Sequence, residues 1–125
     1  MRNDLRRRSF VMGASTALAA ARVSGATERI GIGIIGCGRR GLLKEVLRFA
    51  RECNVEVVAV CDTWRQQREA AAAAVREAGE AEPKSFVRYQ DLLAMPGVDA
   101  VVIGTPDHQH STQLADAARA GKDAY

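Results

Sequence analysis

Aromatic residues are scarce in this chain: phenylalanine, tryptophan and tyrosine together make up 5% of its 125 residues, and there are only two histidines. No stretch interleaves aromatic with basic side chains, which is the pattern expected of a nucleic-acid-binding surface. The histidines and cysteines also lack the spacing of a zinc site. We therefore expect neither nucleic acid nor a metal ion among the binding partners.

An excess of one charge is also missing from most of the chain. The formal net charge is +3, but the first 26 residues hold five of the 18 basic side chains and one of the 15 acidic ones. The other 99 residues therefore carry 13 basic and 14 acidic side chains. Because the basic character belongs to the N-terminal segment, it does not support a nucleic-acid surface. The length allows one small domain at most.

Cysteines number three and form no C-x-x-C pair, so at least one is left without a disulfide partner. Cys37, Cys53 and Cys61 each lie in or beside an apolar run. We predict that all three are small buried side chains rather than redox or metal-binding groups.

An apolar run of about 20 residues, which a membrane helix requires, is absent. The best candidate, residues 10–21, is shorter and is interrupted by glycine and hydroxyl residues. It follows a cationic start and precedes the small residues Ser-Gly-Ala at 24–26, which is the order of an export signal. Arg7 and Arg8, followed by Ser-Phe-Val, resemble a twin-arginine signal. We therefore expect residues 1–26 to direct the protein to the periplasm or another extracytoplasmic site, with a basic disordered tail as the alternative.

Residues 27–125 alternate between strand and helix patterns, as in a parallel sheet with crossover helices. Buried strands are predicted at Ile30–Ile35, Val55–Cys61 and 99–104, a short strand at 85–89, and the start of a fifth at 122–125. Helices are predicted at 42–50, at 63–78 with Thr63 and Gln66 as a capping box, at 90–96 as one turn, and before Gly121. The expected fold class is α/β, a doubly wound parallel sheet.

Gly36, Gly38 and Gly41 form the pattern G-x-G-x-x-G directly after a predicted strand and before a predicted helix. In that context Gly36 permits the turn out of the strand, Gly38 leaves room for a pyrophosphate, and Gly41 lets the helix pack closely on the sheet. The helix start offers free N–H groups and positive dipole to the phosphates. Arg39 and Arg40 add cations there or face solvent.

Asp62 follows the second strand, 21 residues after Gly41. A carboxylate at this point can accept hydrogen bonds from the ribose hydroxyls of an adenosine and would repel a 2′-phosphate. The sequence therefore predicts NAD as the cofactor. Arg65 lies one turn further and could offset that repulsion, which keeps NADP as an alternative. A helix cap is the structural alternative for Asp62, and Thr63 can fill that role.

The segment GTPDHQH, residues 104–110, follows the fourth strand, where ligands bind in open α/β sheets. Pro106 fixes the path of the chain, and Asp107 is expected to cap the next helix. His108 and His110 are two residues apart without a third ligand, so they do not predict zinc. A purely structural place at the helix start is the alternative for His108.

Three segments resemble the family of glucose–fructose oxidoreductase and inositol dehydrogenase. IGIGIIGCGRRG is similar to its first strand and glycine loop, and VVAVCD to its second strand with the terminal acid. GTPDHQHSTQLADAARAGKDAY resembles its T-P-N/D-x-x-H motif, the following helix and A-G-K-x-x-Y. The resemblance covers about residues 29–125.

The resemblance implies cofactor contacts but no catalytic residue in this chain. The implied contacts are the backbone of Gly36, Cys37, Gly38, Arg39, Arg40 and Gly41 at the pyrophosphate, Asp62 at the adenosine ribose, Thr105, Pro106 and Asp107 beneath the nicotinamide half, and His110 as support for that loop.

Relatives continue into a Glu-Lys-Pro motif and a second α/β domain that binds the substrate, whereas this sequence ends at Tyr125. We therefore expect an incomplete N-terminal part of an exported NAD(P)-dependent oxidoreductase. In full-length form it would act on a sugar or polyol and could form homo-oligomers. The alternative is a dinucleotide-binding module, or a decayed fragment, without activity of its own. A methyltransferase with a similar glycine loop would leave the C-terminal segment unexplained.

Overall fold

A five-stranded parallel sheet forms the centre of the computed structural model, which describes residues 28–125. The predicted export signal at residues 1–26 lies outside the described residues. The elements along the chain are β1 (Ile30–Ile35), α2 (Leu42–Phe49), β2 (Val55–Cys61), α3 (Arg65–Glu77), β3 (Lys84–Phe86), α4 (Tyr89–Leu93), β4 (Ala100–Ile103), α5 (Asp107–Arg119) and β5 (Asp123–Ala124).

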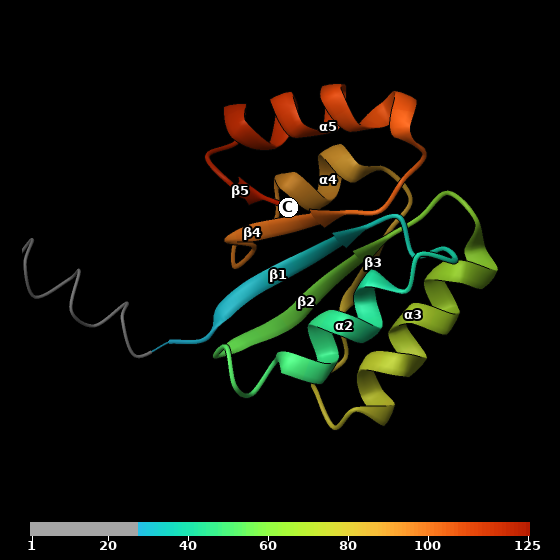
Figure 1. Ribbon diagram of the computed structural model, residues 1–125, viewed down its shortest axis with the longest axis vertical. Helices are drawn as coiled ribbons and strands as arrows, with labels where there is room; N and C mark the ends of the chain where they lie inside the picture. The colour runs from blue at the N-terminus through green and yellow to red at the C-terminus, as the bar shows by residue number, and fades with distance from the viewer. Residues whose placement is uncertain (1–27) are drawn as a thin grey trace, which may run out of the picture.

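The strand order is β3-β2-β1-β4-β5, and every neighbouring pair is parallel. In Figure 1, α2 and α3 cover one face of the sheet while α4 and α5 cover the other. This arrangement confirms the predicted doubly wound fold. The chain leaves β1 toward one face and β4 toward the other, so a crevice opens between these two strands at their carboxyl ends.

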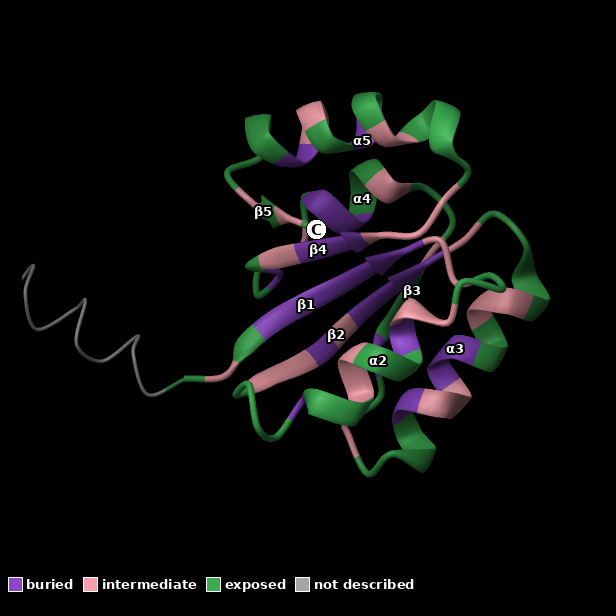
Figure 2. Ribbon diagram, in the orientation of Figure 1, coloured by how far each residue is buried: buried purple, intermediate pink, exposed green. Residues whose placement is uncertain are grey.

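The sheet packs against its helices through two apolar cores, one on each face. Figure 2 shows the central strands buried between the helices. One core joins Ile34 and Val60 of the sheet to Val75 of α3. The other joins Ile35 and Val101 to Leu92 of α4. Because β1 and β2 are covered on both faces, their sequences IGIGII and VEVVAVC are almost entirely non-polar rather than alternating between apolar and polar residues.

The third strand is shorter than the sequence predicts. It ends at Phe86, and Tyr89, predicted as its last residue, begins α4 instead. The hydroxyl of Tyr89 donates a hydrogen bond to Asp116 of α5 at 2.7 Å. This contact links the first residue of α4 to α5.

The prediction of three buried cysteines is wrong for Cys53. Cys61 is buried and Cys37 is half-buried, but Cys53 is exposed in the turn after α2. All three thiols are free.

Thiol reactivity is expected to follow this difference. Burial, and next the negative charge of Asp62, raise the pKa of Cys37 to about 12 and the pKa of Cys61 to about 11. Both thiols therefore stay protonated at pH 8, where the thiolate is the reactive species. We expect a disulfide reagent to modify one cysteine quickly in the native protein and three after denaturation. Cys53→Ser should abolish the fast phase, and a fast phase that survives this substitution would contradict the assignment.

An ion pair ties the start of β1 to the segment after α3. Arg29 Nη1 and Nη2 lie 2.8 and 2.9 Å from the two carboxylate oxygens of Glu80, whose side chain is 11% exposed. Arg29 also donates to the carbonyl oxygen of Val55. The guanidinium spans three segments and so helps to fix the edge of the sheet opposite the crevice.

Replacing Arg29 by Met is expected to destabilise the protein by about 1–2 kcal/mol at neutral pH, because Glu80 loses a charge-assisted hydrogen bond in a poorly solvated place. The hydrogen bond from Arg29 lowers the pKa of Glu80. This stabilisation is therefore complete above the ordinary glutamate pKa of 4.5 and is lost as the pH falls through the lowered value. Urea unfolding at pH 7 and pH 3 should show a smaller difference between the two proteins at pH 3 than at pH 7. An equal difference at both pH values would contradict the role of Glu80.

Candidate functional site

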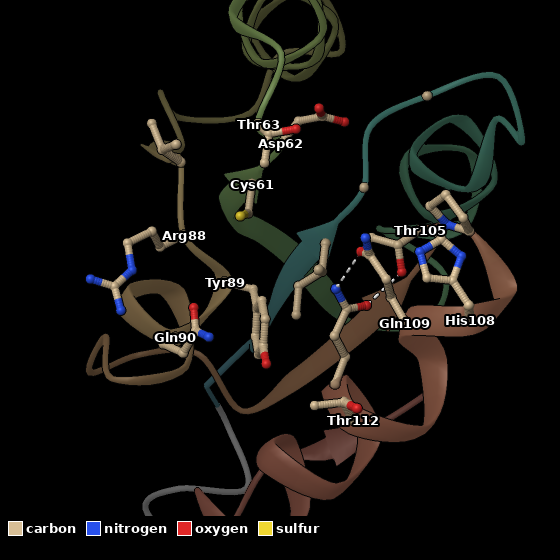
Figure 3. A pocket seen from close by; sticks show the side chains of 17 residues that line it. Cys61, Asp62, Thr63, Arg88, Tyr89, Gln90, Thr105, His108, Gln109 and Thr112 are labelled. Atoms are coloured by element: carbon tan, nitrogen blue, oxygen red, sulfur yellow. Dashed lines mark hydrogen bonds between the residues drawn. The ribbon is translucent and has the colours of Figure 1, made fainter.

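A cavity of about 630 Å³ lies at the carboxyl edge of the sheet, where the crevice between β1 and β4 opens. Five of the predicted site residues line it: Gly36, Gly38, Asp62, Thr105 and Pro106. The other six, Cys37, Arg39, Arg40, Gly41, Asp107 and His110, are near neighbours in sequence of the lining residues but do not line the cavity. Figure 3 shows Asp62 and Thr63 at the top of the view, Tyr89 on the left beside Arg88 and Gln90, and Thr105 and His108 on the right.

Gly36 sits where three strands converge. Its φ is +88°, and a Cβ atom there would lie 2.7 Å from the backbone nitrogen of Thr105. Its N–H donates to the carbonyl oxygen of Cys61 at 2.8 Å. The predicted turn out of the strand is confirmed, and the structure adds that the loop after β1 touches the loop after β4. Only glycine satisfies both the conformation and the contact.

Gly38 has no protein atom within 4 Å of the place where a Cβ would lie, and it borders the cavity. Among residues 28–125, no acceptor takes a hydrogen bond from the backbone N–H groups of Gly38, Arg39 and Arg40. These free N–H groups lie in the loop before α2, and the open space at Gly38 lies beside them, so the loop forms a cradle suited to phosphate oxygens.

Gly41 does not have the role that the sequence predicts. A Cβ atom at this position would meet nothing within 4 Å, so close packing of the helix on the sheet does not require glycine. Instead Gly41 is the N-cap residue of α2 with φ of +68° and ψ of 14°. Its left-handed backbone redirects the chain into the helix, which is a conformation that glycine adopts without strain.

Asp62 connects the glycine loop to the end of β2. Its Oδ2 accepts a hydrogen bond from the backbone N–H of Cys37, and its Oδ1 accepts one from Trp64, both at 2.9 Å. Each carboxylate oxygen can accept a second hydrogen bond, so capacity remains for two ribose hydroxyls. Asp62 therefore fixes the loop geometry and still offers acceptors to a ligand in the cavity.

The predicted capping box of Thr63 and Gln66 is wrong. The N-cap residue of α3 is Trp64, which makes no side-chain cap hydrogen bond. Asp62 accepts from the N–H of Trp64 and so performs the local task that the sequence analysis gave to Thr63.

Arg65 is not directed at Asp62. Its Nε lies 3.7 Å from Glu69, and its side chain is 78% exposed. The arginine at the end of β2 is Arg68, which donates to the carbonyl oxygens of Asp62 and Thr63 at 2.7 and 3.1 Å. Arg68 is thus engaged with backbone oxygens, and Arg65 is paired with Glu69. Neither arginine supports a 2′-phosphate site beside Asp62.

The loop after β4 is fixed by two side chains of α5. His110 Nε2 lies 2.6 Å from the carbonyl oxygen of Thr105. The hydroxyl of Thr105 donates to the side-chain oxygen of Gln113, a buried polar residue, at 2.5 Å. Asp107 does not cap the helix, because Pro106 is the N-cap residue and no side-chain cap bond forms. Asp107 accepts instead from Arg40 at 3.2 Å.

Several lining residues were missed by the sequence analysis. Thr63 follows β2, and the others form two groups, Val87, Arg88, Tyr89 and Gln90 after β3 and Gln109, Thr112 and Gln113 on α5. The rule that ligands lie at carboxyl ends of strands, applied to β3, would have found the first group. Helical spacing from His108 would have found Thr112, which lies one turn further on the same face.

Two other classes of site were searched for in the described part of the chain. Residues 28–125 contain no group of three histidine, cysteine or acidic side chains placed to hold a metal ion. Within the same range no helix has the length and apolar character needed to cross a membrane.

Comparisons with known proteins agree with this geometry. Among curated relatives, a glycosyl hydrolase family 109 protein of Stenotrophomonas maltophilia (strain K279a) is 34% identical over 94% of this chain, and one of Streptomyces niveus is 38% identical over 73%. This chain spans 28% and 19% of the lengths of these two proteins.

Solved structures show the same likeness. The WlbA dehydrogenase of Bordetella pertussis, in complex with NADH and UDP-GlcNAcA, is 31% identical with a TM-score of 0.65 over 78% of this chain and 28% of that one. A putative myo-inositol dehydrogenase of Sinorhizobium meliloti 1021 is 28% identical with a TM-score of 0.62 over 76% and 26%. Residues 30–124 match the model of an oxidoreductase family with an NAD-binding Rossmann fold. The predicted resemblance is confirmed, and the chain belongs to this family of NAD-binding oxidoreductases.

Proposed function

We propose that this chain is the cofactor-holding part of an enzyme that transfers a hydride between NAD and a carbon atom of a sugar or polyol. The observation that carries the proposal is the cradle at the β1–β4 crevice, where Gly38, with its free N–H and the open space beside it, and Asp62 border one cavity. NAD, when bound, supplies the hydride chemistry at its nicotinamide ring.

The residues of the cavity fit such a ligand. The N–H groups of Gly38, Arg39 and Arg40 would hold the pyrophosphate, and Asp62 would hold the adenosine ribose. Thr105, fixed by its hydrogen bond to Gln113, would border the other half of the cofactor. This chain's own part is to bind and orient NAD.

We assign no proton-transfer role to two titratable side chains of the cavity, Tyr89 and His108. Tyr89 lines the cavity, but its hydroxyl donates to Asp116, and that hydrogen bond raises the pKa of Tyr89. The Tyr89 hydroxyl is therefore protonated at neutral pH, and it donates its hydrogen bond to Asp116. His108 lines the cavity without a hydrogen-bonding partner among the described residues. A general base is typically oriented by a third group, and His108 makes no such hydrogen bond with residues 28–125.

The names of the relatives support the class of substrate. One solved relative holds a nucleotide sugar together with NADH, and another is named for a cyclic polyol. A second candidate function is glycoside cleavage with no net change in NAD, because both curated relatives described above are named glycosyl hydrolases.

An assay of the enzyme that contains this chain separates these candidates. With NAD and a panel of free sugars and inositols, the first predicts accumulation of NADH. With nitrophenyl glycosides, the second predicts release of nitrophenol that requires NAD but leaves no NADH. If NADH binds and neither reaction occurs, the chain is a dinucleotide-binding module without catalytic activity.

We also propose that residues 1–26 export the protein in folded form, on the evidence of their sequence order. Residues 1–28 fused to a reporter should carry it across the inner membrane of a bacterium with a twin-arginine system. Replacing Arg7 and Arg8 together by lysine should keep the reporter in the cytoplasm. Equal export of both fusions would contradict the twin-arginine route.

A further inference from the structure

An ion pair crosses the rim of the cavity between two loops that are distant in sequence. Arg40 of the glycine loop points its Nη2 at Oδ1 of Asp107, the first residue of α5, at 3.2 Å. Gly38 lies on one side of this bridge, and Pro106 and His108 lie on the other, and all three line the cavity. The pair therefore joins the two loops that border the crevice between β1 and β4.

Both partners are available to an incoming ligand. The side chains of Arg40 and Asp107 are 63% and 83% exposed, and within residues 28–125 neither has another charged partner. Exposed pairs of this kind contribute little to stability and are screened by salt. The bridge can therefore open without unfolding any element, unlike the poorly solvated pair of Arg29 and Glu80.

The charged groups at the rim have opposite effects on the binding of an anion. Arg40 and the N-terminal end of the α5 dipole both favour a pyrophosphate, whereas the carboxylate of Asp107 offsets both. The phosphates of a dinucleotide cradled at Gly38 would face the same guanidinium that Asp107 holds. Ligand and carboxylate therefore compete for Arg40.

We propose that Asp107 acts as an electrostatic latch: it holds Arg40 across the rim of the free site, and the pyrophosphate of the dinucleotide displaces it. The inference rests on the proposed NAD site. It adds that Asp107 lowers the affinity of this site for the dinucleotide. Asp107 is then a positioning residue for Arg40 rather than a contact that favours the cofactor.

The test is a titration of the full chain with NADH. Binding is monitored by fluorescence energy transfer to NADH from Trp64, which is the single tryptophan. Asp107→Asn should tighten NADH binding by about threefold to tenfold at low salt, and Arg40→Gln should weaken it by a similar factor. In the Arg40→Gln background, Asp107→Asn should bring at most a small further gain, because the latch has lost its partner. High salt should reduce the difference between wild type and Asp107→Asn.

A matched control is available away from the site. Glu82 pairs with Arg76 at 2.8 Å, with side chains 59% and 54% exposed. Glu82→Gln also removes one exposed carboxylate from an ion pair, and it should leave the NADH affinity unchanged.

The outcomes separate the latch from the cofactor site. If the wild type binds NADH while Asp107→Asn binds it equally or more weakly, the latch is wrong and the site stands. A gain of equal size with and without Arg40 would also overturn the latch, because Asp107 would then act independently of Arg40. If no variant binds NADH although circular dichroism shows each one folded, the cofactor site and the latch both fail.

Discussion

Gly36→Ala is expected to destabilise the protein by about 3 kcal/mol or more, because the new side chain combines a strained backbone with a backbone clash. The position has φ of +88°, and its Cβ would lie 2.7 Å from the nitrogen of Thr105. A backbone nitrogen cannot swing aside as the end of a long side chain can. Relief would require β1 and β4 to separate at the crevice, which would also disrupt the pairing of Ile35 with Ile103.

Gly38→Ala provides the matched comparison within the same loop. A Cβ there meets no protein atom within 4 Å. We therefore expect the stability to change little, while NADH affinity falls by about tenfold because the methyl group occupies the space of the pyrophosphate. Urea unfolding and NADH titration of both variants measure the two effects separately. Equal losses of stability in the two variants, or full NADH affinity in Gly38→Ala, would contradict the assigned roles.

Substitution of Asp62 is expected to have the second largest effect, because one carboxylate serves both the fold and the ligand. Asp62→Ala removes the acceptor for the N–H groups of Cys37 and Trp64, which should cost about 1–3 kcal/mol of stability. The glycine loop would lose its link to β2. NADH affinity should fall with it, since both the ribose acceptor and the loop geometry are affected.

Asp62→Asn removes the negative charge together with one of the two backbone hydrogen bonds, because the amide nitrogen cannot accept from an N–H. The amide keeps one oxygen acceptor and nearly the same shape but loses the negative charge that repels a 2′-phosphate. We expect NADH to bind about tenfold more weakly and the preference for NADH over NADPH to narrow. Arg65→Ala serves as the control and should leave this preference unchanged, because Arg65 faces Glu69. A preference that is unaltered in Asp62→Asn but altered in Arg65→Ala would reverse the assignment.

Much of the fold could be predicted because buried parallel strands leave a strong pattern. The apolar β-branched stretches at β1 and β2 have the bounds that the sequence indicates. The glycine loop was identifiable because Gly36 and Gly38 occur between a strand and a helix in the spacing that phosphate binding requires.

Contacts between distant side chains could not be predicted in the same way. Local patterns suggested Thr63 as a cap and Arg65 as a neighbour of Asp62, but rotamers and packing decide which side chain reaches a given atom. Gly41 matched the motif for a reason other than the expected one, since only coordinates reveal its φ of +68°. Tyr89 begins α4, and its hydroxyl donates to Asp116, 27 residues away in the sequence. Such contacts depend on the assembled sheet rather than on neighbours in sequence.

The central claim is that NAD binds over the glycine loop at the β1–β4 crevice. Amide correlation spectra of the isotope-labelled chain, recorded during titration with NADH, test it most directly. The account predicts saturable shifts centred on the amides of Gly38, Arg39 and Arg40 and on those next to Asp62, with small changes in α3 beyond its first turn and at the remote edge near Glu80. A folded chain whose glycine-loop amides do not move at saturating NADH, or whose shifts centre elsewhere, would contradict it.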